Sequence, residues 1–101
     1  MRVFISAGMT GRSEEDVLDD IQKATDWIHE EIDKNAEIVH TYFQEEAPAD
    51  AGPTWYLGKS IQVLGTCDLC CFVGDWEMYR GCVAELHICE IYGIDRTYFV
   101  R

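Results

Sequence analysis

The sequence predicts a single α/β domain with a small parallel sheet of four strands. Short apolar segments of strand length alternate with longer segments that show helical periodicity, and a strand-like segment stands at each end. This order implies a parallel sheet with right-handed crossovers and helices on both faces. With 101 residues, 48% of them hydrophobic, residues 1–101 suit one domain with a substantial core.

The first half of the chain predicts a strand, a helix and a strand. Arg2–Ser6 is apolar and β-branched, as in a buried strand. Ser13 is a good N-cap, and the acids that follow it suit a helix N-terminus. These acids are Glu14, Glu15 and Asp16. Apolar residues then recur at steps of three and four, which predicts an amphipathic helix. They are Val17, Ile21, Ala24, Ile28 and Ile32. We expect Asn35 to end this helix and residues 37–42 to form the second strand.

The second half predicts a loop followed by two helices and two strands. Residues 43–53 form a long loop with two prolines, and loops of this length are often functional. We expect Thr54 to cap a helix over residues 55–64. Leu69–Val73 is a short apolar run between Asp68 and a Gly-Asp pair, as in a fully buried central strand.

A helix over about residues 79–92 follows the central strand, and Gly93 suits its C-terminal end. Residues 97–100 predict the last strand.

The charge balance restricts the partners of the protein. There are 19 acids and 8 bases, so the net charge is −11, which argues against nucleic-acid polymers and anionic membranes. One small phosphate needs only local positive groups and is not excluded. No segment is long enough to span a bilayer, and the first residues lack the apolar region of a signal peptide. We therefore expect a cytoplasmic location.

Five cysteines, an odd number in a chain without an export signal, argue against disulfides. Cys67-x-x-Cys70 and His87-x-Cys89 raise the alternative of a zinc site. However, Cys70 and Cys71 are neighbours on a predicted strand, so their side chains point to opposite faces. We expect no bound metal and interpret the thiols as small buried hydrophobes.

Ligands of parallel α/β sheets bind beyond the carboxyl ends of the strands. The loops at that edge are residues 8–12, 43–53 and 74–81. Three of the eight basic residues lie in or just after these loops, which favours a small anion there unless the placement is chance. They are Arg12, Lys59 and Arg80.

Several loop residues are binding candidates with structural alternatives. The first loop offers Gly8, Met9, Gly11 and Arg12; its Gly-x-x-Gly is a weak phosphate-loop signal and suits an ordinary turn equally.

The loop after the central strand offers an acid and an aromatic. Asp75 could bind a ribose hydroxyl or be a solvated acid. Trp76 could stack on a base or anchor its loop against the core.

Glu85 is the candidate catalytic residue. On a helical projection it borders the apolar side of its helix, whereas a solvated acid would sit where Glu90 does. Gly81 lies one turn earlier and leaves space for a ligand. A carboxylate near a helix N-terminus is expected to stay ionised, as a nucleophile requires.

Three segments carry a family resemblance that covers nearly the whole chain. They are Phe4-Ile-Ser-Ala-Gly-Met-Thr-Gly11, Cys67-Asp-Leu-Cys-Cys-Phe-Val73 and Trp76-Glu-x-x-x-Gly-Cys-x-x-Glu85. Together they resemble the nucleoside 2-deoxyribosyltransferase superfamily, and most of all a small bacterial and phage branch of it. The Gly-x-x-x-Glu element after a buried strand is the most specific part.

The resemblance implies a flavodoxin-like Rossmannoid fold, a three-layer sandwich, usually assembled as dimers or larger oligomers. Members cleave or exchange the N-glycosidic bond of nucleosides or nucleotides, and no cofactor is implied. The nucleophilic glutamate of the family falls on Glu85, whose carboxylate would attack the anomeric carbon as in retaining glycosidases.

Three residues differ from the family pattern. Phe4 stands where a tyrosine is frequent, Ser60 about where transferases have aspartate, and Tyr79 where many members have aspartate or serine. Two alternatives to an enzyme therefore stay open: a non-catalytic nucleotide-binding module, and an oligomeric interaction protein. The aromatics Trp27 and Trp55, with the neighbouring Tyr56, favour a homo-oligomer, a dimer or tetramer, in each case.

Overall fold

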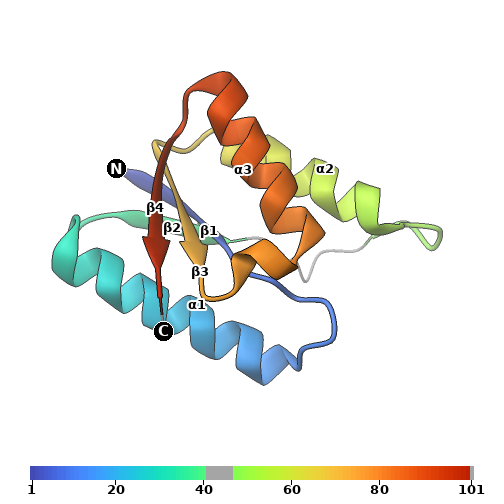
Figure 1. The fold of residues 1–101 in the computed structure, drawn as a ribbon, viewed down its shortest axis with the longest axis horizontal. Helices are drawn as coiled ribbons and strands as arrows, with labels where there is room; N and C mark the ends of the chain where they lie inside the picture. The colour runs from blue at the N-terminus through green and yellow to red at the C-terminus, as the bar shows by residue number, and fades with distance from the viewer. Residues whose placement is uncertain (41–46, 101) are drawn as a thin grey trace.

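The computed structural model describes residues 1–40 and 47–100. Its strands are β1 (Arg2–Ser6), β2 (Glu37–His40), β3 (Leu69–Val73) and β4 (Asp95–Phe99). Its helices are α1 (Glu14–Glu31), α2 (Pro53–Leu64) and α3 (Arg80–Tyr92), with a short 3-10 helix, η1 (Trp76–Met78), just before α3. Figure 1 shows how these elements are arranged.

The four strands form one sheet in the order β2-β1-β3-β4, and every neighbouring pair is parallel. The chain starts in the middle of the sheet, adds β2 on one side, and then places β3 and β4 on the other. This is the order of a flavodoxin-like sheet. The predicted fold class, a small parallel α/β domain, is therefore confirmed.

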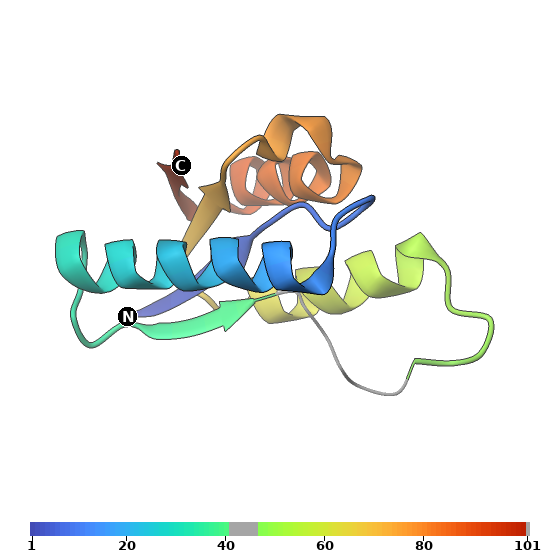
Figure 2. The same cartoon turned by 90° about the horizontal axis from the view of Figure 1, so that it is seen from below.

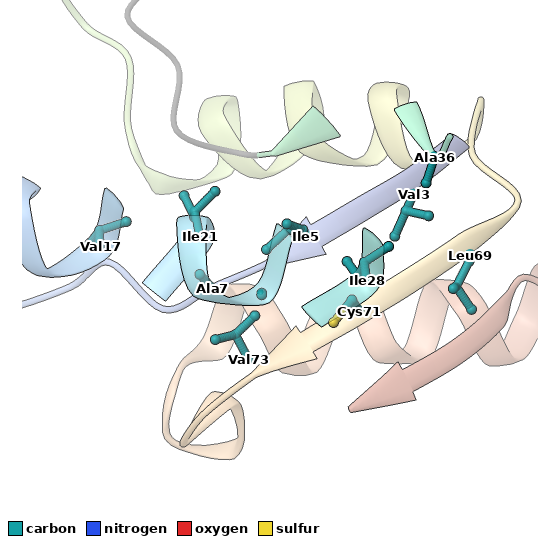
Figure 3. Packing of buried hydrophobic residues seen from close by; sticks show 11 residues of the cluster. Val3, Ile5, Ala7, Val17, Ile21, Ile28, Ala36, Leu69, Cys71 and Val73 are labelled. Atoms are coloured by element: carbon teal, nitrogen blue, oxygen red, sulfur yellow. The ribbon is translucent and has the colours of Figure 1, made fainter. Parts of the chain in front are cut away.

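The helices cover both faces of the sheet. Helix α1 packs on one face, and α2 and α3 pack on the other (Figures 1 and 2). Figure 3 shows the core beneath α1, where Val3 and Ile5 of β1 meet Ile21 and Ile28 of α1. Since alternate strand residues face opposite ways, Phe4 of β1 lies in the other core, with α2 and α3.

Strand β3 is buried along its whole length, which explains its uninterrupted apolar sequence. Cys71 lies in the core under α1, and Cys70 lies in the core under α2 and α3. The prediction that these neighbours diverge is confirmed. Asp68 accepts a hydrogen bond from the Arg2 backbone N–H at 2.7 Å, so it ties the entry of β3 to the start of β1.

Helix α1 begins where the sequence predicts, but it ends earlier than predicted. The Ser13 hydroxyl accepts a hydrogen bond from the backbone N–H of Asp16, as an N-cap should. The helix ends at Glu31, before the predicted stop, and leaves Ile32 exposed. The reason is local: the Asp33 carboxylate accepts the Asn35 backbone N–H and holds a turn in place of another helical turn.

Helix α2 begins two residues earlier than predicted. Its N-cap is Gly52 and Pro53 is its first residue, so the predicted capping role of Thr54 is wrong. Proline is favoured at the first helical position because its φ is already helical and its missing N–H would have no intrahelical partner there.

The boundaries of the outer strands also differ from prediction. Strand β4 starts at Asp95, which pairs with Leu69 of β3, and stops short of Val100. Of the predicted second strand, residues 41 and 42 lie outside the described residues, as does part of the predicted loop over residues 43–53. Within the described part of the chain, none of the helices is long and apolar enough to cross a membrane.

The two cores give a direct test of the fold. Leu64 of α2 is fully buried, whereas Leu18 on the outer side of α1 is 37% exposed. Leu64→Ala should lower the free energy of unfolding by roughly 2–5 kcal/mol, because it removes buried methyl groups and leaves a cavity. The same change at Leu18 should cost about 0.5 kcal/mol or less. Denaturant titration measures both, and equal losses would contradict this packing.

Candidate functional site

A cleft of about 760 Å³ opens beyond the carboxyl end of β1. Its walls come from the loop after β1, from the start of α2 with the residues just before it, and from the start of α3. Strands β1 and β3 are neighbours here, and the strand order reverses between them. In doubly wound sheets this switch point is where ligands bind.

Glu85 lines this cleft and is almost completely buried, with 4% of its surface exposed. The Ser6 hydroxyl, at the carboxyl end of β1, donates a hydrogen bond to Glu85 Oε1 at 2.9 Å. Glu85 Oε2 is buried as well and has no hydrogen-bond partner among the described residues. The site therefore holds a carboxylate with one oxygen hydrogen-bonded and the other buried without a hydrogen-bond partner among the described residues.

Burial raises the pKa of Glu85 to about 7, and the hydrogen bond from Ser6 opposes part of this rise. The expectation that the helix N-terminus keeps this carboxylate fully ionised therefore needs correction. A helix dipole typically contributes only ~0.3–1 kcal/mol, whereas desolvation of a buried carboxyl group can shift its pKa by several units. Near pH 7, the protonated and ionised forms of Glu85 are both populated.

Ser6 is the residue of this site that sequence reasoning missed. The signal for it was weak but present: a hydroxyl residue that ends an otherwise apolar strand at the carboxyl edge of the sheet. Ser6 is fully buried and pairs with Phe72 of β3, so its backbone lies inside the sheet.

The structure brings half of the predicted binding residues to the cleft. Gly8 and Met9 from the first loop line it, as do Arg80 and Gly81 at the start of α3. A Cβ atom added at Gly81 would meet nothing within 4 Å, so the space expected one turn before Glu85 is present.

Only a glycine fits at position 8, because the Tyr79 ring occupies the space that a side chain would need. A Cβ atom there would overlap the ring of Tyr79, which packs directly on the Gly8 backbone and also lines the cleft. Any side chain at position 8 would force Tyr79 to move. The tyrosine that departs from the family pattern therefore forms a wall of the cleft.

Gly11 and Arg12 do not line the cleft. The Arg12 backbone N–H bonds to the Met9 carbonyl at 3.1 Å, and Gly11 takes a φ of 75° in this turn, a conformation that favours glycine. The Arg12 guanidinium donates to the Asp20 carboxylate at 2.6 Å and to the Gly8 carbonyl at 3.0 Å. Arg12 therefore holds the loop onto α1 and is already paired.

Asp75 and Trp76 also lie outside the cleft lining. Asp75 is exposed at the start of η1. The Trp76 ring packs 5.2 Å from the Phe72 ring and 5.8 Å from the Tyr98 ring, measured between centroids. Of the two interpretations of Trp76, this contact favours the one in which it anchors its loop against the core.

The cleft carries little charge. Among its described lining residues, Glu85 is the one acid and Arg80 the one base. Lys59, the third basic residue near this edge, instead lies over the Trp55 ring at 5.7 Å. In the part of the chain that the structure describes, no group of three or more His, Cys, Asp or Glu side chains is arranged to hold a metal ion.

Comparison with models of known protein families and with curated proteins finds no match. Fold and site thus define a class: a small parallel α/β domain with a buried carboxylate at the switch-point cleft. A functional assignment has to rest on the chemistry of that cleft.

The raised pKa of Glu85 has a consequence for stability. A carboxyl whose pKa rises from 4.5 to about 7 on folding binds more protons in the folded state, so its contribution to stability falls as pH rises through that window. In Glu85→Gln this fall should be absent. Between pH 5 and pH 8 the variant should therefore gain about 2–3 kcal/mol in free energy of unfolding relative to the parent.

Denaturant titration at both pH values measures this difference. Glu90→Gln is the matched control, because Glu90 is exposed on the same helix. It should follow the parent. Equal losses of stability between pH 5 and pH 8 in Glu85→Gln and in the parent would contradict a pKa of Glu85 raised by burial.

Proposed function

We propose that the protein is a nucleoside or nucleotide N-glycosidase or deoxyribosyltransferase that uses Glu85 as its nucleophile. The observation that carries this proposal is the buried Glu85 carboxylate, with Oε2 unpartnered, in a cleft of about 760 Å³. Small-molecule sites typically measure ~300–1,000 Å³, so the cleft has room for a nucleoside or nucleotide. The resemblance to the nucleoside 2-deoxyribosyltransferase superfamily supports the same assignment.

The proposed reaction is a double displacement. Glu85 Oε2 attacks the anomeric carbon, a C–O bond forms, and the C–N bond breaks with its electron pair leaving on the base, which takes up a proton from solvent. Water, or a second base, then attacks the same carbon, releases the carboxylate and returns a proton to solvent. The negative charge of Glu85 also stabilises the positive charge that develops on the sugar.

The cleft walls support a ligand of this kind. Tyr56 and Tyr79 line the cleft as aromatic residues on which a base can pack, while the open space at Gly81 leaves room near Glu85 for a sugar. Arg80, exposed at the start of α3, is the basic residue that an anionic substituent on the sugar would meet. No nucleic-acid polymer and no membrane enters this proposal, given the net charge of −11.

A second candidate is a non-catalytic module that binds a nucleotide-like ligand. It is favoured by the single acid among the described cleft-lining residues, because glycoside hydrolysis usually uses two carboxyl groups. Ser60 lines the cleft about where transferases of the superfamily have an aspartate, and its hydroxyl bonds to the Tyr56 carbonyl at 3.1 Å.

We also propose that the protein forms a homo-oligomer, a dimer or tetramer. The aromatic side chains that predicted an oligomer pack partly on other residues of the same chain, since Trp27 packs on Phe99 and Trp55 on Tyr56. Tyr56 itself is 44% exposed, and two neighbouring residues at the end of α3 are more exposed: Ile91 at 70% and Tyr92 at 74%.

Light scattering at micromolar concentration should give a mass of about twice or four times the 11.6 kDa of one chain. Ile91→Asp should lower that mass if the end of α3 is the interface, because a buried unpaired carboxylate is costly. A monomer mass for the parent protein would contradict oligomer formation.

Turnover of a panel of nucleosides and nucleoside 5′-monophosphates tests the nucleophile. Glu85→Gln should reduce turnover by several orders of magnitude, since an amide is a poor nucleophile and this reaction class requires ~8 kcal/mol or more of catalysis. Turnover by the parent should rise with pH through about 7, as Glu85 ionises. The exposed Glu90→Gln is the control and should retain activity.

The same panel in a thermal-shift assay separates the two candidates. A compound that stabilises both the parent and Glu85→Gln without being turned over indicates the binding module, because a ligand that binds only the folded state raises its stability. Undiminished turnover by Glu85→Gln would remove Glu85 from the mechanism.

A further inference from the structure

We propose that Ser6 is a positioning residue: it holds Oε1 of Glu85, so that Oε2 is the oxygen presented to the ligand. This inference rests on the proposed function, because it names the support of that nucleophile. The contact joins residues 79 positions apart in the chain, and both side chains are buried.

The support is rigid because of where Ser6 lies. It is the last residue of β1, and β1 runs between β2 and β3 in the interior of the sheet. Its Cα pairs with that of Phe72 in β3, and a serine has one short side-chain torsion before its hydroxyl. The donor therefore stands at a position set by the backbone of the sheet, and α3 brings Glu85 to it.

The two carboxylate oxygens of Glu85 are not equivalent. Oε1 accepts the Ser6 hydroxyl at 2.9 Å, whereas Oε2 is buried without a partner among the described residues. Buried polar atoms are nearly always hydrogen-bonded, so an orphan on a cleft-lining side chain indicates a group that a ligand supplies. A half-turn of the carboxylate exchanges two chemically identical oxygens, so in either orientation one oxygen accepts the Ser6 hydroxyl and the other is left without a partner among the described residues.

The other groups near Glu85 do not replace this donor. The thiols of Cys70 on β3 and of Cys82 and Cys89 on α3 interact with Glu85 electrostatically. Burial raises the pKa of Cys82 to about 11, and a hydrogen bond with Cys89, together with burial, raises the pKa of Cys70. Cys70 and Cys82 therefore stay protonated at pH 5–8, whereas the hydrogen bond with Cys70 lowers the pKa of Cys89.

The remaining ionisable groups of the cleft come from α2 and from the start of α3. Tyr56 on α2, and Tyr79 and Arg80 at the start of α3, line the same cleft. Among the described residues, Ser6 gives the side-chain hydrogen bond that Glu85 accepts. A hydrogen-bond donor stabilises the ionised form of a carboxylate. The bond from Ser6 therefore lowers the pKa of Glu85 and opposes part of the rise that burial causes.

The test compares Ser6→Ala, Ser6→Cys and Ser6→Thr in the full-length protein. Carbon-13 NMR of glutamate carboxyl groups follows the titration of Glu85, and the signal absent from Glu85→Gln assigns it. Ser6→Ala should raise the midpoint of this titration by about one pH unit, because hydrogen bonds to charged groups are the stronger ones. Ser6→Cys, a weaker donor, should raise it less, and Ser6→Thr should restore it.

In turnover assays, the pH profile of kcat/KM should move with the NMR midpoint. One pH unit corresponds to about a tenfold loss for Ser6→Ala at pH 6, with a smaller loss above pH 8. A loss independent of pH, with an unmoved midpoint, would overturn the inference, because damage to packing alone gives that result. If Ser6→Ala does not fold, Ser6→Cys replaces it in the test. Its titration midpoint should rise, and an unmoved midpoint would overturn the inference.

The two proposals fail in different ways. If Glu85→Gln abolishes turnover but Ser6→Ala titrates like the parent, Glu85 keeps its role and the inference about Ser6 is wrong. If the parent turns over no nucleoside or nucleotide, the proposed function fails, and Ser6 as support of a nucleophile fails with it. A raised NMR midpoint would then establish only the hydrogen bond.

Discussion

The parallel pairing of β1 with β3 is the constraint on which the rest of the structure depends. It joins the first strand of the chain to a strand more than 60 residues later, with Val3 opposite Leu69 and Ser6 opposite Phe72. Because β2 lies on the other side of β1, the crossovers leave in opposite directions, and a crevice forms where these two strands end. Glu85, in the first turns of α3, lines that crevice, and Ser6 at the end of β1 donates a hydrogen bond to it from within the sheet.

Burial of the Glu85 carboxyl group lowers the free energy of unfolding of the protein once that group is ionised. Holding Glu85 at a pKa of about 7 instead of 4.5 corresponds to about 3 kcal/mol of lost stability once the group is ionised. A small domain has only ~5–15 kcal/mol of net stability, so this is a large share to spend on one side chain. Such a cost is typical of a functional position, where geometry and reactivity are kept at the expense of stability.

Charge is distributed unevenly over the helix N-termini, and this shapes the cleft. The first turn of α1 carries Glu14, Glu15 and Asp16 behind the Ser13 cap, whereas the first turns of α2 and α3 carry no acid. In a chain with 19 acids, this leaves the two helix starts that border the cleft without local negative charge. Glu85, one turn into α3, is almost completely buried there, and this burial is the main cause of its raised pKa.

The sequence by itself determined the elements, their order and the position of the carboxylate. Apolar periodicity, the Ser13 cap and the buried run of β3 are local signals, and all three are present in the structure. Tertiary structure alone decided which groups meet: Ser6 with Glu85, Arg12 with Asp20, and the Trp76 ring with Phe72. The physical reason is that spacing along the chain reports helix and strand faces, whereas these partners depend on strand order and on competition among neighbours. Arg12 and Trp76 were candidates for ligand binding, and in the structure Arg12 pairs with Asp20 while the Trp76 ring packs on Phe72 and Tyr98.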